Sequence, residues 1–308
     1  MIKNKNSFMD CRLSSVLVMM ILSSRKDMWI KLLFLSFFLL SPSVFASAKS
    51  FLMKENNQIL MQEGNNQYRH TPCSTFKIAI SLMGYNEGIL QDENHPELPY
   101  KEGYVDWLEV WKQPHNPRTW MKNTCIWYSQ IITQKLGVEK FQNYIKNFNY
   151  GNQDASGDKG KNNGLTNSWL SSSLEISAEE QIAFLQNLLN NQLPVSQKSR
   201  DITKNLLFLE VLDGGWKLYG KTGSGYQLNQ DGSRNEDRQI GWFVGWIIKG
   251  SRTIIFACYI EDKEKIEGSA GKRAKEEAKE KLKQWIEARL NDERTGLAIP
   301  AKPEGRYA

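Results

Sequence analysis

Cysteine and histidine are scarce in this sequence of 308 residues. Of its four cysteines, Cys11 lies in an N-terminal segment that we expect to be removed, which leaves Cys73, Cys125 and Cys258. An odd number of thiols cannot form a closed disulfide framework. The three histidines are far apart, with no H-x-H or H-E-x-x-H arrangement, and no cysteine pair has zinc-binding spacing. We therefore expect no metal site and no metal-dependent hydrolysis.

A concentrated stretch of basic residues is also lacking. The formal net charge is +6, but lysine and arginine do not form a stripe interleaved with aromatic residues. Nucleic-acid binding therefore gains little support. Hydrophobic residues make up 40% of the chain and aromatic residues 11%, which suits a substantial core in one large domain or two closely packed lobes.

Residues 28–48 have the layout of a secretory signal peptide: a lysine, an apolar stretch, then small residues that predict cleavage after Ala46 or Ala48. Residues 1–27 fit this layout poorly because they add a second apolar block upstream, so we infer that translation starts at Met28. An uncleaved anchor is the alternative, but each apolar block is shorter than the ~20 residues needed to cross a bilayer. We expect a periplasmic or secreted protein without a stable membrane anchor.

The hydrophobic pattern predicts strands at both ends of the mature chain and helices between them. Expected strands lie within 50–63 and at 216–220, 241–249 and 253–260, and expected helices at 74–86, 124–136, 138–147, 177–191, 196–211 and 271–290, with a polar loop at 150–168 and a hairpin at 224–238. The last helix carries Ala274, Ala278, Leu282 and Ile286 on one apolar stripe. This order predicts an α+β fold: an antiparallel sheet flanked by terminal helices, with an all-helical lobe beside it.

Ser74 and Lys77 stand three residues apart, just before an apolar run with helical spacing. On the first turn of a helix, residues i and i+3 are neighbours, so the hydroxyl and the amine could touch. The same spacing occurs at Ser156 with Lys159 and again at 269–272. Taken alone, the pair is therefore better explained as a chance serine near a chance lysine.

A second motif, Lys221-Thr222-Gly223, directly follows an expected strand. It would place a cation and a hydroxyl at the edge of the sheet, where they could bind the carboxylate of a ligand. The glycine allows a close approach of the backbone. With Ser74 and Lys77 upstream, the motif completes the serine, lysine and K-T-G order known from penicillin-recognising enzymes.

Further tracts narrow the resemblance. In chain order they are P-C-S-T-F-K at 72–77, W-M-K-N-T-C-I-W-Y-S-Q at 120–130, Y-G-N at 150–152, W-L at 169–170, I-S at 176–177, K-T-G at 221–223 and G-W-F-V-G-W at 241–246. From about Lys49 to the final helix, the sequence resembles the class D serine β-lactamases, the oxacillinase type. The resemblance implies a serine β-lactamase/penicillin-binding-protein-like fold for 49–308 and hydrolysis of the β-lactam ring of penicillin-type antibiotics.

Acyl transfer needs a nucleophile, a base, donors for the oxyanion and a way to hold the substrate. The resemblance gives Ser74 the role of nucleophile, with its own backbone N–H and that of Ser224 as oxyanion donors. In this family the base is a lysine N-carboxylated by carbon dioxide, which here would be Lys77. Carbon dioxide or bicarbonate would then be required, but no cofactor or metal ion.

The surroundings expected for Lys77 suit this modification. An amine buried among Phe76, Ile126, Trp169 and Leu170 has its charged form disfavoured, and only the neutral amine attacks carbon dioxide. The indole N–H of Trp169 would donate to the resulting carbamate. That carbamate could take the proton of the nucleophile and later activate water against the acyl-enzyme.

The resemblance also implies contacts to the substrate. Lys221 and Thr222 would face the β-lactam carboxylate with Arg273 as a bidentate partner, a solvated helix arginine being the alternative for Arg273. Trp111 would line the substrate mouth, while core packing is the alternative for the other tryptophans nearby. The implied catalytic residues are Ser74, Lys77, Thr124, Trp169, Lys221 and Ser224, and the implied substrate-binding residues are Trp111, Ile126, Leu170, Thr222, Gly223 and Arg273.

The sequence departs from the family at Thr124-Cys125-Ile126, where Ser-x-Val is usual. The family serine is thought to pass a proton toward the lactam nitrogen and to touch the lysine of K-T-G. Threonine keeps the hydroxyl, but in a helix its side chain splits between two rotamers. We expect an active enzyme with a narrow, penicillin-biased profile.

Two other functions use related machinery. A penicillin sensor domain would be acylated at Ser74 without turnover, but it normally needs a retained membrane segment. A peptidase acting on cell-wall D-alanyl peptides shares the serine, the lysine and K-T-G, but the W-Y-S-Q, Y-G-N and W-L tracts favour the β-lactamase. Cys73 and Cys125 flank the catalytic positions and are expected to be small buried thiols.

Overall fold

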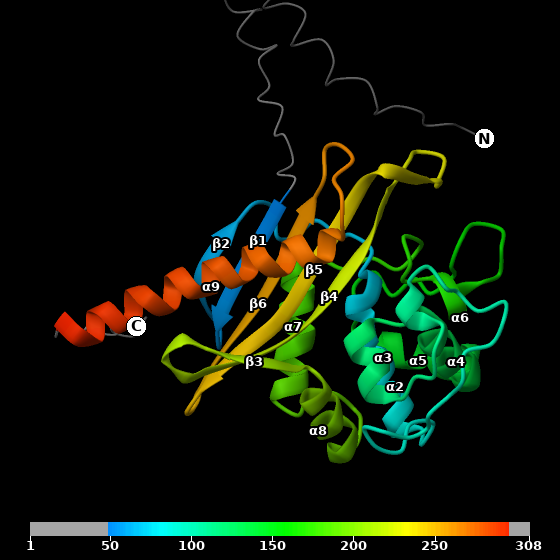
Figure 1. Cartoon of the computed structure of the whole chain (residues 1–308), viewed down its shortest axis with the longest axis horizontal. Coiled ribbons are helices and arrows are strands. Elements are labelled where there is room, and N and C mark those ends of the chain that lie inside the picture. The colour runs from blue at the N-terminus through cyan, green and yellow to red at the C-terminus, as the bar shows by residue number, and fades with distance from the viewer. Residues whose placement is uncertain (1–48, 296–308) are drawn as a thin grey trace, which may run out of the picture. The chain divides into compact units, whose positions relative to one another are not determined.

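The computed structural model describes residues 49–295, so the predicted upstream extension at 1–27 and signal peptide at 28–48 lie outside the described residues. The described chain contains an antiparallel sheet with strand order β2-β1-β6-β5-β4-β3 (Figure 1). The strands are β1 (Lys49–Glu55), β2 (Gln58–Glu63), β3 (Phe208–Leu212), β4 (Trp216–Leu228), β5 (Arg234–Lys249) and β6 (Arg252–Glu261). Early and late segments pair directly, since Phe51 of β1 lies opposite Cys258 of β6. The predicted α+β fold is confirmed.

Helices cover both faces of this sheet. They are α2 (Lys77–Asn86), α3 (Pro117–Asn123), α4 (Ile126–Leu136), α5 (Val138–Asn147), α6 (Gly164–Asn167), α7 (Ala178–Leu189), α8 (Gln197–Leu206) and α9 (Ala270–Thr295), with 3-10 turns η2 (Cys73–Phe76), η3 (Glu109–Trp111) and η4 (Asp213–Gly215). The long helix α9 lies on one face, and the helical lobe lies beyond the other (Figure 1). Across residues 49–295, each helix is too short or too polar to cross a lipid bilayer.

Strand β5 separates two hydrophobic cores. Successive side chains of a strand point to opposite faces. Trp242 and Val244 accordingly belong to the core shared with the helical lobe, while Phe243 and Ile247 belong to the core under α9. Burial on both faces explains why the segment G-W-F-V-G-W-I-I is apolar throughout rather than alternating.

Three of the predicted boundaries are wrong. The helix expected at 196–211 ends at Leu206, and its remainder is the edge strand β3. The strands expected at 216–220 and 241–249 are too short, because β4 and β5 continue through the expected hairpin at 224–238 and leave only 229–233 as its loop. The helix expected at 124–136 begins at Ile126, after a separate helix α3. Strand pairing accounts for the first two differences, and the left-handed backbone of Thr124 accounts for the third.

The apolar stripe predicted on the last helix is confirmed. Ala274, Ala278, Leu282 and Ile286 are all buried against the sheet. Small alanine side chains let the first half of α9 approach the strands closely, and the larger side chains fill the core farther along. Polar residues occupy the opposite side of α9, where Lys283 is 56% exposed at its side chain.

Truncating this stripe should destabilise the protein. Leu282→Ala leaves a cavity in a fully buried site, so we expect the free energy of unfolding to fall by ~2–5 kcal/mol. The matched change Lys283→Ala on the exposed side should alter it by less than ~0.5 kcal/mol. Urea denaturation followed by tryptophan fluorescence measures both. Equal effects of the two variants would show that α9 does not depend on this core.

Candidate active site

The Ser74 turn packs against the edge of β4 at the point where β3 no longer pairs with it. Strand β3 pairs with β4 only as far as Tyr219, so the edge of β4 beyond it is open. The turn η2 packs there: a Cβ added to Gly223 would meet the carbonyl oxygen of Pro72 at 2.8 Å and Cys73 Cβ at 3.2 Å. A glycine is therefore required at this position by the close approach of the turn. This packing brings the Ser74 and K-T-G motifs together.

Ser74 and Lys77 form the contact expected from their spacing. Lys77 Nζ donates a hydrogen bond of 3.2 Å to Ser74 Oγ. Lys77 is completely buried, and burial lowers the pKa of its amine to about 7. Because the charged form is disfavoured without solvent, the neutral amine is accessible near neutral pH. The lysine beside the serine can thus act as a nucleophile toward carbon dioxide or as a proton acceptor.

Thr124 reaches the same hydroxyl from the end of α3. Its Oγ1 lies 3.4 Å from Ser74 Oγ. The residue is the C-cap of α3 and has a left-handed backbone with φ of 52°, which is uncommon for a β-branched side chain. The expectation that Thr124 sits inside a helix is therefore wrong, and the helical rotamer argument does not apply to it. The left-handed cap instead holds the hydroxyl at the serine.

Trp169 contributes a buried donor without an acceptor. Its ring packs against Phe76 and Phe141, with centroid distances of 5.6 and 6.1 Å. Within residues 49–295, the indole Nε1 has no hydrogen-bond partner although it is buried. Buried N–H groups are nearly always bonded. The indole can therefore donate to an added acceptor, and the side chains of Ile126 and Leu170 are buried as well. A carbamate on Lys77 as that acceptor stays a prediction.

Lys221 is a second buried amine. Its Nζ donates to the carbonyl oxygen of Thr222 at 3.0 Å. Burial, and then the proximity of Lys77 and Lys275, hold the pKa of Lys221 well below its ordinary value. An anion entering the site would favour its charged form. This property suits a lysine that meets a substrate carboxylate.

Ser224 connects β4 to the start of α9. Its hydroxyl lies 2.7 Å from that of Ser269 and accepts a hydrogen bond of 2.9 Å from the backbone N–H of Gly271. Sequence reasoning treated Ser269 only as part of a chance serine–lysine repeat. The feature that brings it to the site is the long-range packing of α9, which its local sequence does not encode. The oxyanion roles of the Ser74 and Ser224 backbone N–H groups stay predictions.

Arg273 is engaged within the protein. Its guanidinium forms an ion pair with the buried carboxylate of Asp262 and donates a hydrogen bond of 3.0 Å to the carbonyl oxygen of Glu267. The side chain is 24% exposed, so it is not the solvated arginine of the alternative interpretation. Its contact with a substrate carboxylate stays a prediction, and that contact would have to compete with Asp262.

The tryptophans divide into core and surface. Trp120 and Trp127 are buried, which confirms core packing for both. Trp111 is only 3% exposed, and its indole donates to the carbonyl oxygen of Asn123 at 2.8 Å. Trp107, whose ring centroid lies 6.1 Å from that of Trp111, is 61% exposed. A role for Trp111 at the substrate mouth stays a prediction, and Trp107 offers the more accessible ring.

The remaining residues near the motifs are structural. Asn152 fixes the loop after Tyr150, because its side chain donates to the Ser173 carbonyl and accepts from the Glu175 N–H. These bonds give the Y-G-N tract at 150–152 a structural role in the turn. Burial raises the pKa of Cys125 to about 11, so its thiol is neutral and inert. No group of metal-binding side chains occurs among residues 49–295.

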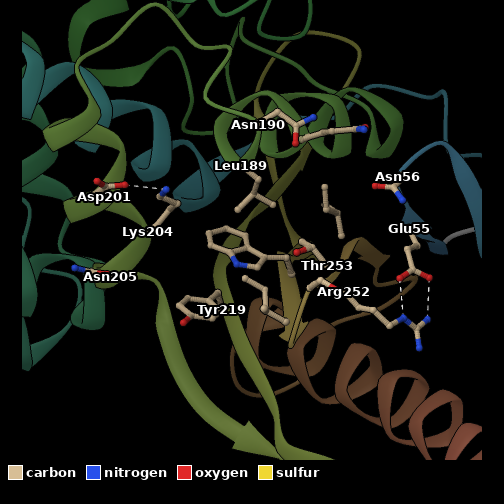
Figure 2. A pocket seen from close by; sticks show the side chains of 15 residues that line it. Glu55, Asn56, Leu189, Asn190, Asp201, Lys204, Asn205, Tyr219, Arg252 and Thr253 are labelled. Carbon is tan, nitrogen blue, oxygen red and sulfur yellow. Dashed lines mark hydrogen bonds and ion pairs between the residues drawn. The ribbon is translucent and has the colours of Figure 1, made fainter.

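A separate groove of about 760 Å³ lies away from these motifs. It is bordered by the β1–β2 turn, the end of α7 and part of α8, and contains Tyr219 (Figure 2). Two ion pairs line it, Glu55 with Arg252 and Asp201 with Lys204. The residues around it include no candidate catalytic residue.

Comparisons with known proteins agree with this site. Residues 43–283 match the family described as penicillin binding protein transpeptidase domain. The chain is 41% identical over 220 residues to β-lactamase OXA-9 of Klebsiella pneumoniae, which spans 71% of this chain and 80% of that protein. The solved structure of the class D β-lactamase OXA-427 has a TM-score of 0.74 and 42% identity, covering 78% of this chain and 99% of that one.

A receptor domain shares the fold at greater distance. The C-terminal domain of the Bacillus licheniformis BlaR penicillin receptor matches with a TM-score of 0.67 and 25% identity, covering 77% of this chain and 90% of that one. Identity to the two enzymes is higher, at 41 and 42%. Together with the assembly of the serine, lysine and K-T-G motifs around Ser74, these similarities show that the chain belongs to the class D serine β-lactamase family.

Proposed function

We propose that this protein hydrolyses the β-lactam ring of penicillin-type antibiotics through an acyl-enzyme on Ser74, with N-carboxylated Lys77 as general base in both half-reactions. The observation that carries the proposal is the buried contact between Lys77 Nζ and Ser74 Oγ, 3.2 Å long. A pKa of about 7 gives Lys77 the neutral amine that carboxylation needs. The bound carbamate would supply an oxygen base, and the unpaired indole N–H of Trp169 would hold it.

The other residues have roles set by their positions. Ser74 attacks the lactam carbonyl, and backbone N–H groups of Ser74 and Ser224 receive the developing negative charge. Thr124 passes a proton toward the lactam nitrogen as the ring opens, since its hydroxyl lies 3.4 Å from Ser74 Oγ. Lys221 and Thr222 hold the substrate carboxylate, and substrate binding offsets the burial of the Lys221 charge. Water then releases the opened product.

Repeated turnover separates this function from that of a penicillin receptor. We expect each mole of protein to open many moles of penicillin, measured by absorbance and by intact-mass spectrometry of the protein. One mole opened and retained as an adduct would instead indicate a receptor. We also propose export with cleavage after Ala46 or Ala48, which N-terminal sequencing of protein from the periplasm or medium would test.

Removing the nucleophile should abolish turnover and preserve the fold. Ser74→Ala deletes one hydroxyl in a buried turn, so we expect the hydrolysis rate to fall by about 10³-fold or more. Ser156→Ala is the matched control, because Ser156 also precedes a lysine by three residues but lies in the polar loop. Steady-state kinetics and circular dichroism would check both variants. Turnover retained by Ser74→Ala would exclude the serine mechanism.

Activity should depend on pH and bicarbonate in a linked way. Below the Lys77 pKa of about 7 the ammonium form dominates and cannot add carbon dioxide. After degassing, we expect the rate to fall with decreasing pH, by about tenfold per unit well below pH 7, and to rise again on adding bicarbonate. Initial rates between pH 5 and 8 test this. A profile indifferent to bicarbonate would count against carboxylation and leave the fold unaffected.

Thr124 should matter through its hydroxyl. Thr124→Ala removes the proton relay beside Ser74, so we expect a rate loss of about 10²-fold or more. Thr124→Ser keeps the hydroxyl and removes the β-branch from a left-handed backbone, so it should be tolerated or beneficial. Pre-steady-state kinetics with a chromogenic penicillin would report acylation directly. An unchanged rate in Thr124→Ala would show that Thr124 serves only in packing and in capping α3.

A further inference from the structure

The segment from Trp169 to Ser171 is fixed by hydrogen bonds from separate parts of the chain. On one side, Arg234 of β5 donates to the carbonyl oxygen of Leu170 at 3.0 Å. From β4, the backbone N–H of Tyr226 donates to Ser171 Oγ at 3.0 Å. Ser171 itself has a left-handed backbone with φ of 50°. Such a conformation in a residue other than glycine persists only where surrounding contacts hold it.

Thr71 holds the other side of this segment with one hydroxyl. Its Oγ1 donates to the carbonyl oxygen of Trp169 at 2.9 Å and accepts from the backbone N–H of Ser171 at 3.1 Å. The hydroxyl therefore bridges both ends of the three-residue segment. Thr71 is 7% exposed, so water cannot readily replace either bond. Because a threonine hydroxyl has one donor and can accept from another group, both of these bonds can exist together.

The backbone of Thr71 is anchored as well. Its carbonyl oxygen accepts a hydrogen bond of 3.0 Å from the indole of Trp242 on β5. Three residues later the chain reaches Ser74. Thr71 thus connects the strand under the site, the turn that carries the nucleophile and the segment that carries Trp169. The sequence alone indicated no role for Thr71, because its local pattern does not predict contacts with Trp169 or Ser171, about 100 residues later.

The placement of Trp169 matters because its indole Nε1 is a buried donor that has no hydrogen-bond partner among residues 49–295. A shift of this donor by a fraction of an ångström would weaken its bond to an acceptor on Lys77, since sites tolerate only small displacements of their positioning groups. The packing of the indole against Phe76 restrains the ring. The bonds of Thr71 restrain the backbone from which that ring projects.

We propose that Thr71 is a positioning residue that sets the location of the Trp169 indole and thereby the affinity of Lys77 for carbon dioxide. This inference rests on the proposed carboxylation of Lys77. The Thr71 hydroxyl does not contact the lysine and takes no part in bond making. Its loss lowers the occupancy of the carbamate, so added bicarbonate compensates for it.

The experiment compares Thr71→Val, which removes both bonds at nearly constant shape, with Thr71→Ser, which keeps them. Ser199→Ala is the control, because it removes a fully buried hydroxyl whose bond stays within the cap of α8. Carboxylation is measured directly by carbon-13 NMR of the carbamate in ¹³C-labelled bicarbonate. The bicarbonate concentration that gives half-maximal activity is measured in parallel.

For Thr71→Val we expect the half-saturating bicarbonate concentration to rise by about tenfold, because the variant loses both hydrogen bonds that hold the backbone of the Trp169–Ser171 segment. The rate should return close to that of the unmodified sequence at saturating bicarbonate. Thr71→Ser and Ser199→Ala should keep the original half-saturation in both NMR and kinetics. If Thr71→Val does not fold, Thr71→Ala, which adds no apolar methyl against the two unpaired backbone groups, gives the same comparison.

Three negative results are distinguishable. If the unsubstituted protein gives no carbamate signal and no bicarbonate dependence, the proposed function of Lys77 fails. If it gives both and Thr71→Val has the same half-saturation, the positioning role of Thr71 is wrong while carboxylation stands. A shift of equal size in Ser199→Ala would also overturn the inference, because it would trace the effect to general destabilisation.

Discussion

The burial of one lysine amine next to a serine is the constraint on which the site depends. A fully buried ammonium is costly, and without a carboxylate partner the favourable outcome is a neutral amine. Lys77 is in this situation, with a pKa of about 7. The packing that excludes water from Lys77 therefore also lowers the pKa of its amine. The buried Trp169 indole N–H, whose ring packs against Phe76, also has no hydrogen-bond partner among residues 49–295.

The sheet supplies the second half of the site through its topology. Because β3 covers only the first part of β4, the edge bearing Lys221 is open to the Ser74 turn. On the opposite face α9 packs through its alanines, and its first turn reaches Ser224 through Gly271. The K-T-G motif therefore lies on a strand of the sheet, and the Ser74 turn packs directly against that strand. Such support is what small tolerances at a reacting centre require.

Unusual backbone conformations gather around the nucleophile. Cys73, Thr124 and Ser171 are left-handed, with φ values of 51°, 52° and 50°. Each lies beside a residue assigned to the site or belongs to it, and none is a glycine. Conformations of this kind cost free energy locally and are retained where the surrounding structure over-determines them. The bonds of Thr71 and Tyr226 to Ser171 are examples of such support.

The sequence by itself determined the features that depend on local periodicity and short spacing. The helix at 138–147, the apolar stripe of α9 and the contact between Ser74 and Lys77 follow from neighbours three or four residues apart. Only the tertiary structure decided that Thr124 is a left-handed cap and that Arg273 pairs with Asp262. It alone placed the Thr71 hydroxyl on the Trp169 segment. The physical reason is that these arrangements depend on packing and buried hydrogen bonds between residues whose separation in sequence carries no periodic signal.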